Sequence, residues 1–149
     1  MSIEVHYIAN GMECSCCGKI EFPFVNKICD CHTHGLSEYG SLELQIVLDL
    51  GMYNLKCIMS HLVDLVISGR KFTDGYELKD ESPFEDCSVK FLETKDCDGN
   101  PILRVIFPDS NNLYPDNSKC VGVYKYQFLP YEDLLRKDYA PCFKGKRVE

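Results

Sequence analysis

The sequence lacks several features that would place the protein in a membrane or on a nucleic acid. No apolar run approaches the roughly 18 residues that a membrane-spanning helix needs. Basic residues are scarce, since 16 Lys and Arg stand against 23 Asp and Glu, for a net charge of −7. An acidic surface repels phosphate backbones, so no nucleic-acid partner is expected. The N-terminal residues carry neither the basic nor the apolar region of a secretory signal, and we therefore expect a cytoplasmic protein.

The chain also lacks repeats, low-complexity tracts and any linker that would divide it. Its 149 residues, 45% of them hydrophobic and 26% charged, have the length and composition of a single globular domain over 1–149. Neither a Gly-rich phosphate-binding loop nor a serine-hydrolase elbow occurs in the sequence. Familiar catalytic motifs therefore do not identify a reaction.

Two neighbouring segments with different periods define the centre of the expected fold. In residues 42–50 every even position is Leu or Ile, and this period of two predicts a strand with one buried face. From Leu55 onward, apolar residues recur at steps of three and four, which predicts an amphipathic helix over 55–68. Asn54 is the expected N-cap, and Gly69 is expected just after the helix ends.

Further strands are expected on both sides of this centre. Residues 87–93 and 102–107 flank Asp98-Gly99-Asn100, which is a strong signal for a hairpin turn. A short helix is predicted from Pro130 to Lys137. Other extended segments are predicted over 3–9, 27–34 and 121–128. The expected fold class is α+β, with a mostly antiparallel sheet and one main amphipathic helix.

Soft metal ligands are concentrated near the N-terminus. Residues 14–19 read Cys-Ser-Cys-Cys-Gly-Lys, and residues 29–34 read Cys-Asp-Cys-His-Thr-His. The first run contains the C-x-x-C-G-K spacing of a zinc knuckle, in which two thiolates hold one ion from a tight turn. We therefore expect a cysteine-rich, zinc-binding hairpin over residues 10–32, inserted into the fold.

The spacing of the two runs gives a preferred set of zinc ligands and several alternates. If residues 27–34 are extended, Cys29 and Cys31 share one face of the strand, whereas His32 and His34 share the other. A Cys₄ site that includes Cys31 is then sterically easier than a Cys₃His site. The preferred ligands are Cys14, Cys17, Cys29 and His32, with Cys16, Cys31 and His34 as alternates.

Other interpretations of these side chains stay open. The cysteines could be buried thiols without a metal, or Cys14 and Cys17 could form a reversible redox disulfide. On the expected helix, Cys57, His61 and Asp64 lie in one stripe that resembles a nucleophile, a base and an orienting carboxylate. A solvated polar face is the better interpretation, because three side chains of one straight helix rarely converge on one atom.

Several motifs in the middle of the chain carry a family resemblance. In chain order they are Thr33-His34-Gly35-Leu36, Tyr39-Gly40-Ser41-Leu42-Glu43-Leu44, Gly69-Arg70-Lys71-Phe72 and Val105-Ile106-Phe107-Pro108-Asp109. Over about residues 30–116 they resemble the bacterial family catalogued as domain of unknown function 4262 (DUF4262). Here Ser41-Leu42 replaces the family's His-Pro, and Phe107 replaces its Trp. The resemblance implies the order of strands and helix but no reaction, and the cysteine-rich segment resembles an insertion outside the matched core.

Two classes of function follow from a zinc site of this kind. Four soft ligands form a closed, structural site, so we favour a non-enzymatic zinc module whose acidic surface binds another protein. The alternative is a hydrolase-type enzyme in which three ligands, for example Cys14, Cys17 and Cys29, leave one zinc position open. The number of protein ligands on the metal therefore separates the two classes.

Overall fold

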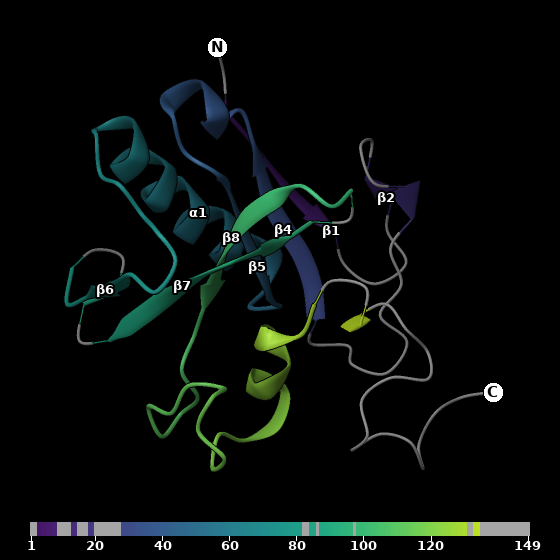
Figure 1. The fold of residues 1–149 in the computed structure, drawn as a ribbon, viewed down its shortest axis with the longest axis vertical. Coiled ribbons are helices and arrows are strands. Elements are labelled where there is room, and N and C mark those ends of the chain that lie inside the picture. The colour runs from purple at the N-terminus through teal and green to yellow at the C-terminus, as the bar shows by residue number, and fades with distance from the viewer. Residues whose placement is uncertain are drawn as a thin grey trace.

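A computed structural model describes residues 3–8, 13–14, 18–19, 28–81, 84–85, 87–96, 98–130 and 133–134. The main strands are β1 (Glu4–Ile8), β4 (Ile28–His34), β5 (Glu43–Leu48), β6 (Glu77–Lys79), β7 (Ser88–Lys95) and β8 (Pro101–Ile106). They form one six-stranded sheet in the order β1-β4-β5-β8-β7-β6 (Figure 1). The helices are α1 (Met52–Ile67) and two 3₁₀ helices, η1 (Leu36–Tyr39) and η2 (Gly122–Phe128).

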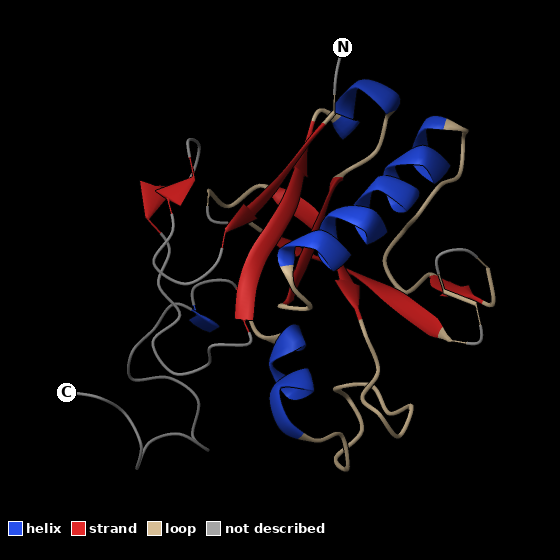
Figure 2. Ribbon diagram, turned by 180° about the vertical axis from the view of Figure 1, so that it is seen from behind, coloured by secondary structure: helices blue, strands red, loops and turns tan. Residues whose placement is uncertain are grey.

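The sheet is mixed, which refines the prediction of a mostly antiparallel one. Four of its five neighbouring pairs are antiparallel, but β5 and β8 are parallel. Parallel neighbours need a long crossover connection, and here the chain between β5 and β8 forms α1, β6 and β7. Figure 2 shows α1 packed across one face of the sheet. The α+β class predicted from the sequence is confirmed.

The helix α1 has the apolar stripe that its period predicts. It begins three residues earlier than expected, at Met52, because Gly51 with a φ of 92° serves as its N-cap. The Asn54 side chain instead donates a hydrogen bond to the carbonyl of Leu50. Gly69, with a φ of 109°, follows the end of the helix as predicted. The buried residues of α1 are Leu55, Met59, Leu62, Val63 and Val66.

Residues 121–128, predicted as a strand, form the 3₁₀ helix η2 instead. The cause is Gln127, whose side chain is fully buried. Its amide nitrogen donates to the carbonyl of Phe107 at 2.7 Å, and its amide oxygen accepts from the N–H of Phe107 at 2.8 Å. The side chain thus supplies both hydrogen bonds that a neighbouring strand would give to Phe107. Tyr124, Tyr126 and Phe128, which alternate along this segment, therefore lie on η2 rather than on a strand, and Phe128 is 40% exposed.

The predicted cysteine-rich segment contains a short hairpin. Strands β2 (Glu13–Cys14) and β3 (Gly18–Lys19) pair antiparallel, with Cys14 opposite Gly18. Residues 9–12, 15–17 and 20–27 lie outside the described part of the chain, so the zinc knuckle stays a prediction. Most of the helix expected over 130–137 also lies outside it. In the described segments, no helix has both the length and the apolar character needed to cross a membrane.

Candidate metal site

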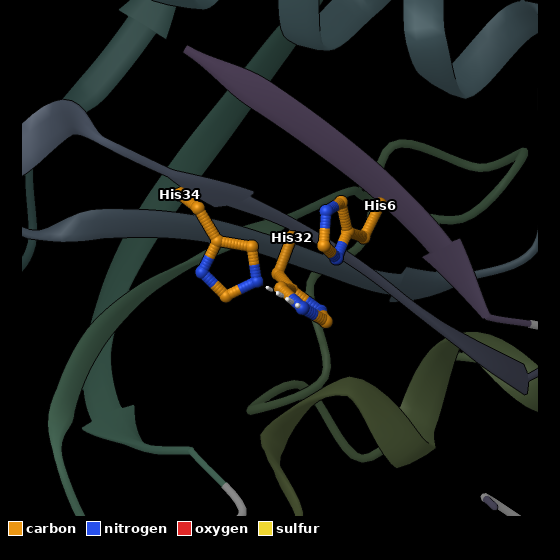
Figure 3. A group of neighbouring side chains, drawn as sticks. All are labelled: His6, His32 and His34. Carbon is orange, nitrogen blue, oxygen red and sulfur yellow. Dashed lines mark hydrogen bonds between the residues drawn. The ribbon is translucent and has the colours of Figure 1, made fainter. Parts of the chain in front are cut away.

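Three of the four histidines of the chain meet on the face of the sheet away from α1. His6 lies on β1 directly opposite His32 on the antiparallel strand β4. His34 follows two residues later on β4, and side chains two residues apart in a strand share a face. Figure 3 shows the three rings projecting from the two strands toward one another. Pairing of strands far apart in the sequence therefore assembles this histidine cluster.

The spacing within the histidine cluster suits a metal ion. The candidate ligand atoms of its three residues all lie within 4.8 Å of one another. Nε2 of His32 is 3.1 Å from Nε2 of His34. Two nitrogens bound tetrahedrally to zinc at about 2.0–2.1 Å would be about 3.3 Å apart, so this pair is already near ligand spacing. The rings of His6 and His34 meet edge to face, with centroids 4.4 Å apart.

Two carboxylates orient the rings of the histidine cluster. Oδ1 of Asp30 lies 2.9 Å from Nδ1 of His32, and Oε1 of Glu4 lies 2.9 Å from Nε2 of His6. An ionised carboxylate only accepts hydrogen bonds, so each of these ring nitrogens carries a proton. In the neutral imidazoles the lone pairs then lie on Nε2 of His32 and Nδ1 of His6. Carboxylate partners of this kind fix the ring orientation and raise the basicity of metal-binding histidines.

The histidine cluster borders a pocket of about 360 Å³. Its lining includes His32 and His34 together with the carboxylates of Glu43, Asp96 and Asp98. There is no lysine or arginine among the described residues that line it. The volume lies within the usual range for small-molecule sites. A metal held by the histidines would therefore be accessible to a small molecule.

Glu43 shapes one wall of this pocket. Its Oε1 accepts hydrogen bonds from the Thr33 hydroxyl at 2.8 Å and the Leu36 N–H at 3.1 Å. Its Oε2 accepts from the N–H groups of Gly35 at 3.1 Å and Ser37 at 3.3 Å. The carboxylate thus satisfies the backbone N–H groups at the start of η1, which have no partner within the helix. Glu43 therefore holds the turn between β4 and η1 in place.

The predicted cysteine ligands on β4 lie on the other face of the strand from the histidines. Cys29 and Cys31 are both fully buried in the core beneath α1, and the Cys29 thiol approaches the carbonyl of Ile46 at 3.8 Å. Burial raises the pKa of the Cys31 thiol to about 12, with a further contribution from the charge of Asp30. Burial also raises the pKa of Cys29 far above its usual range. Both therefore behave as small apolar residues, as the buried-thiol interpretation expects.

The four-residue zinc set expected from the sequence stays a prediction. Cys29 and His32 lie on opposite faces of β4, so this strand does not present both of them to one ion. The side chain of Cys14 and all of Cys16 and Cys17 lie outside the described residues. The structure does bring together His32 and His34, one preferred ligand and one alternate, in the histidine cluster.

Sequence reasoning missed His6 as a member of the cluster. Both segments that carry the cluster were expected to be extended, over 3–9 and 27–34. The pairing of His6 with His32, however, depends on the register of two strands. The signal that could have found it is the alternation of His32 and His34, which places two imidazoles on one face of a strand. A histidine on a neighbouring strand could then complete a set of three ligands.

The stripe on α1 has the solvated character expected of it. Cys57, His61 and Asp64 are all exposed. A ring nitrogen of His61 lies 2.9 Å from the backbone carbonyl of Cys57, one turn earlier in the helix. The imidazole therefore interacts with the backbone rather than with the Cys57 thiol.

Comparisons with protein-family models, with curated proteins and with solved structures find no match. The resemblance to the DUF4262 family accordingly stays a prediction. The functional conclusion rests on the geometry of the histidine cluster and its pocket.

Proposed function

We propose that this protein is a zinc-dependent enzyme of the hydrolase type, with its zinc held by His6, His32 and His34. The single observation that carries the proposal is the convergence of three imidazoles, two of them paired with carboxylates, at the edge of a pocket. Among the described residues, the group of candidate ligands has three members. Three ligands favour the enzymatic class over the closed structural site that the cysteine spacing suggests.

Zinc is the proposed metal because of the chemistry of the donors. Neutral imidazole suits zinc, copper, iron and nickel, whereas magnesium and calcium prefer oxygen ligands. Catalytic zinc sites typically combine three protein ligands with one open position, and structural sites use four. When bound, such an ion supplies a Lewis acid and lowers the pKa of a water that it binds.

The residues of the chain have separate roles in this proposal. Asp30 and Glu4 keep His32 and His6 in the tautomers and orientations that a metal needs. The pocket admits a small substrate beside His32 and His34. Asp98 lines the same pocket and is the candidate to accept a proton from a water there, whereas Oδ1 of Asp96 accepts hydrogen bonds from the N–H groups of Asp98 and Asn100 in the hairpin turn.

Two further parts of the proposal come from the sequence. We place the protein in the cytoplasm, where a reducing environment keeps thiols such as those of Cys29 and Cys31 free. We also place its central segment in the DUF4262 family. The expected zinc at the cysteine-rich hairpin competes with the histidine cluster as the location of the metal, so the two sites need a direct test.

The test is the zinc content of untagged protein, measured by elemental analysis in three forms. His6→Ala is the decisive variant, because His6 belongs to the histidine cluster but not to the set expected from the cysteine spacing. We expect about one zinc per chain in the wild type, loss of zinc in His6→Ala and retention of zinc when Cys14→Ser is combined with Cys17→Ser. Zinc that survives His6→Ala but disappears from the double variant would move the site to the cysteines and overturn the proposal.

Catalysis needs its own measurement. Hydrolysis of an activated ester such as 4-nitrophenyl acetate should be faster with the zinc-loaded protein than with the same concentration of free zinc. Chelation or His6→Ala should abolish that difference, because either change removes the Lewis acid. A protein that holds zinc at the histidines without any such rate enhancement would be a binding protein rather than an enzyme.

A further inference from the structure

A row of polar residues crosses four neighbouring strands on the face of the sheet away from α1. The directly opposed pairs are His6 and His32, then His32 and Gln45, then Gln45 and Arg104. Gln45 and Arg104 are fully buried, and His32 is 5% exposed. Buried polar side chains in the middle of a sheet need hydrogen-bond partners, because each unsatisfied group is costly. We therefore expect each buried polar side chain of this row to have hydrogen-bond partners.

The hydrogen bonds of this row converge on Asp30. Arg104 donates from Nε to Oε1 of Gln45 at 2.8 Å, and Gln45 donates from Nε2 to Oδ1 of Asp30 at 3.2 Å. The same Asp30 oxygen faces Nδ1 of His32 at 2.9 Å. Arginine can only donate and an ionised carboxylate can only accept, so the glutamine amide between them has one satisfactory orientation. We call Arg104, Gln45 and Asp30 the polar relay.

Arg104, at the end of the polar relay away from the histidines, is hydrogen-bonded to η2 and the residue after it. Arg104 donates from Nη1 to the backbone carbonyls of Gln127 at 2.8 Å and Leu129 at 2.5 Å. These carbonyls lie at the end of η2 and just after it. One buried guanidinium thus contacts the support of the histidine cluster on one side and the segment 122–130 on the other. In Figure 1, η2 lies beside the lower end of the sheet, at the opposite end from η1.

We propose that the polar relay couples metal occupancy of the histidine cluster to docking of residues 122–130 on the sheet. This inference rests on the proposed function, since it concerns the same metal. A metal on Nε2 of His32 makes its Nδ1–H a stronger donor to Asp30, which holds the Asp30 carboxylate in the position where it also accepts from Gln45. Gln45 and Arg104 are positioning residues in this scheme. Because coupling between two binding events is reciprocal, detachment of residues 122–130 lowers the affinity for the metal.

Hydrogen–deuterium exchange with and without zinc tests the coupling in the full chain. Zinc should slow exchange of the backbone amides in residues 122–130 by at least about fivefold, the lower end of typical coupling between sites. Amides of α1, which packs on the opposite face, serve as the internal control and should change much less. A purely structural network would stabilise residues 122–130 equally in both states, so the zinc-dependent difference separates the two roles.

Gln45→Met breaks the polar relay while keeping the approximate size of the side chain. Zinc affinity should fall by about 10-fold to 100-fold, as it does when outer partners of metal ligands are removed. The zinc-dependent protection of residues 122–130 should disappear. Val47→Ala is the matched control, because Val47 is fully buried two residues along the same strand and belongs outside the polar relay. It should keep both the affinity and the protection.

The outcomes distinguish this inference from the proposed function. Failure of the wild type to bind zinc overturns both. Binding of zinc without any change in exchange at residues 122–130 overturns the coupling alone, as does undiminished protection in Gln45→Met. If Gln45→Met fails to fold, Asp30→Asn tests the coupling instead, because it removes the charge from the polar relay with little change in shape. Asp30→Asn that preserves the full zinc-dependent protection would also overturn the coupling.

Discussion

The two faces of β4 differ in chemistry. One face carries Cys29 and Cys31 into the core beneath α1, and the other carries Asp30, His32 and His34 toward the pocket. The residues alternate along seven positions of one strand. Both faces contain residue types that bind zinc, and among the described residues the histidine face is the one that groups them as candidate ligands.

The difference shows that residue type alone does not make a side chain a candidate ligand, because its surroundings differ from one face to the other. The thiols have apolar neighbours and raised pKa values, which disfavour the thiolate that a metal needs. Two of the three imidazoles, those of His6 and His32, have carboxylate partners that fix the orientation of their rings. Composition alone would favour the cysteines of β4 as metal ligands. The packing of the sheet instead favours its histidines, because it buries Cys29 and Cys31 in the core. Four experiments test this contrast.

The largest expected effect is on thiol reactivity. Iodoacetamide should modify Cys57 at least about a thousandfold faster than Cys31 in the folded protein. Cys57 is exposed, whereas Cys31 is fully buried with a pKa raised from 9.0 to about 12, which lowers its thiolate fraction about a thousandfold. Pulsed alkylation followed by mass spectrometry measures both rates. In denaturant the two rates should converge, and similar rates in the native protein would contradict the core assignment of Cys31.

The second contrast compares neighbouring residues of β4 in zinc affinity. His32→Ala should weaken zinc binding more than about 100-fold, because it removes a ligand outright and loss of an outer partner alone reaches that figure. Cys31→Ala should leave the affinity within about twofold of the wild type, since its side chain faces α1. Competition with a chromophoric chelator measures both constants. A larger loss in Cys31→Ala would mean that the thiol face binds the metal.

The third contrast concerns stability. Cys31→Ser should lower the free energy of unfolding by about 1–3 kcal/mol, because it buries a hydroxyl among apolar neighbours. Cys57→Ser, on the exposed side of α1, should change it by no more than about 0.5 kcal/mol. Urea titrations followed by circular dichroism give both values. Equal effects would indicate that Cys31 is not in the core.

The smallest expected effect belongs to the fourth histidine. His61→Ala should change the free energy of unfolding by about 0.5 kcal/mol or less and should leave the zinc content unaltered. His61 is exposed and lies beside the carbonyl of Cys57 rather than beside another candidate ligand. Elemental analysis and urea titration check the two parts. A loss of zinc in this variant would contradict the assignment of the site to the histidine cluster.

Local patterns predicted most of the central elements. The period-two run became β5 and the period of three to four became α1. The prediction of one buried face was wrong for β5, since Gln45 and Val47 on its other face are fully buried as well. Asp98-Gly99-Asn100 marked the hairpin between β7 and β8, where Gly99 adopts a φ of 82°. The same reasoning failed at η2, where the side chain of Gln127 takes the hydrogen bonds that strand pairing would provide. The periodicity of residues 121–128 cannot reveal that Gln127 bonds to Phe107, which lies 20 residues away in the sequence.

The candidate site likewise has one part that the local sequence predicts and another that depends on tertiary contacts. Thiols and imidazoles alternate in residues 29–34, so any extended conformation of this segment separates them onto two faces. Tertiary structure alone decided which face meets α1, which therefore buries Cys29 and Cys31 as apolar groups. It also decided the register that brings His6 opposite His32. The physical reason is that side-chain alternation is set within one strand, whereas strand pairing and helix packing depend on contacts between residues far apart in the chain.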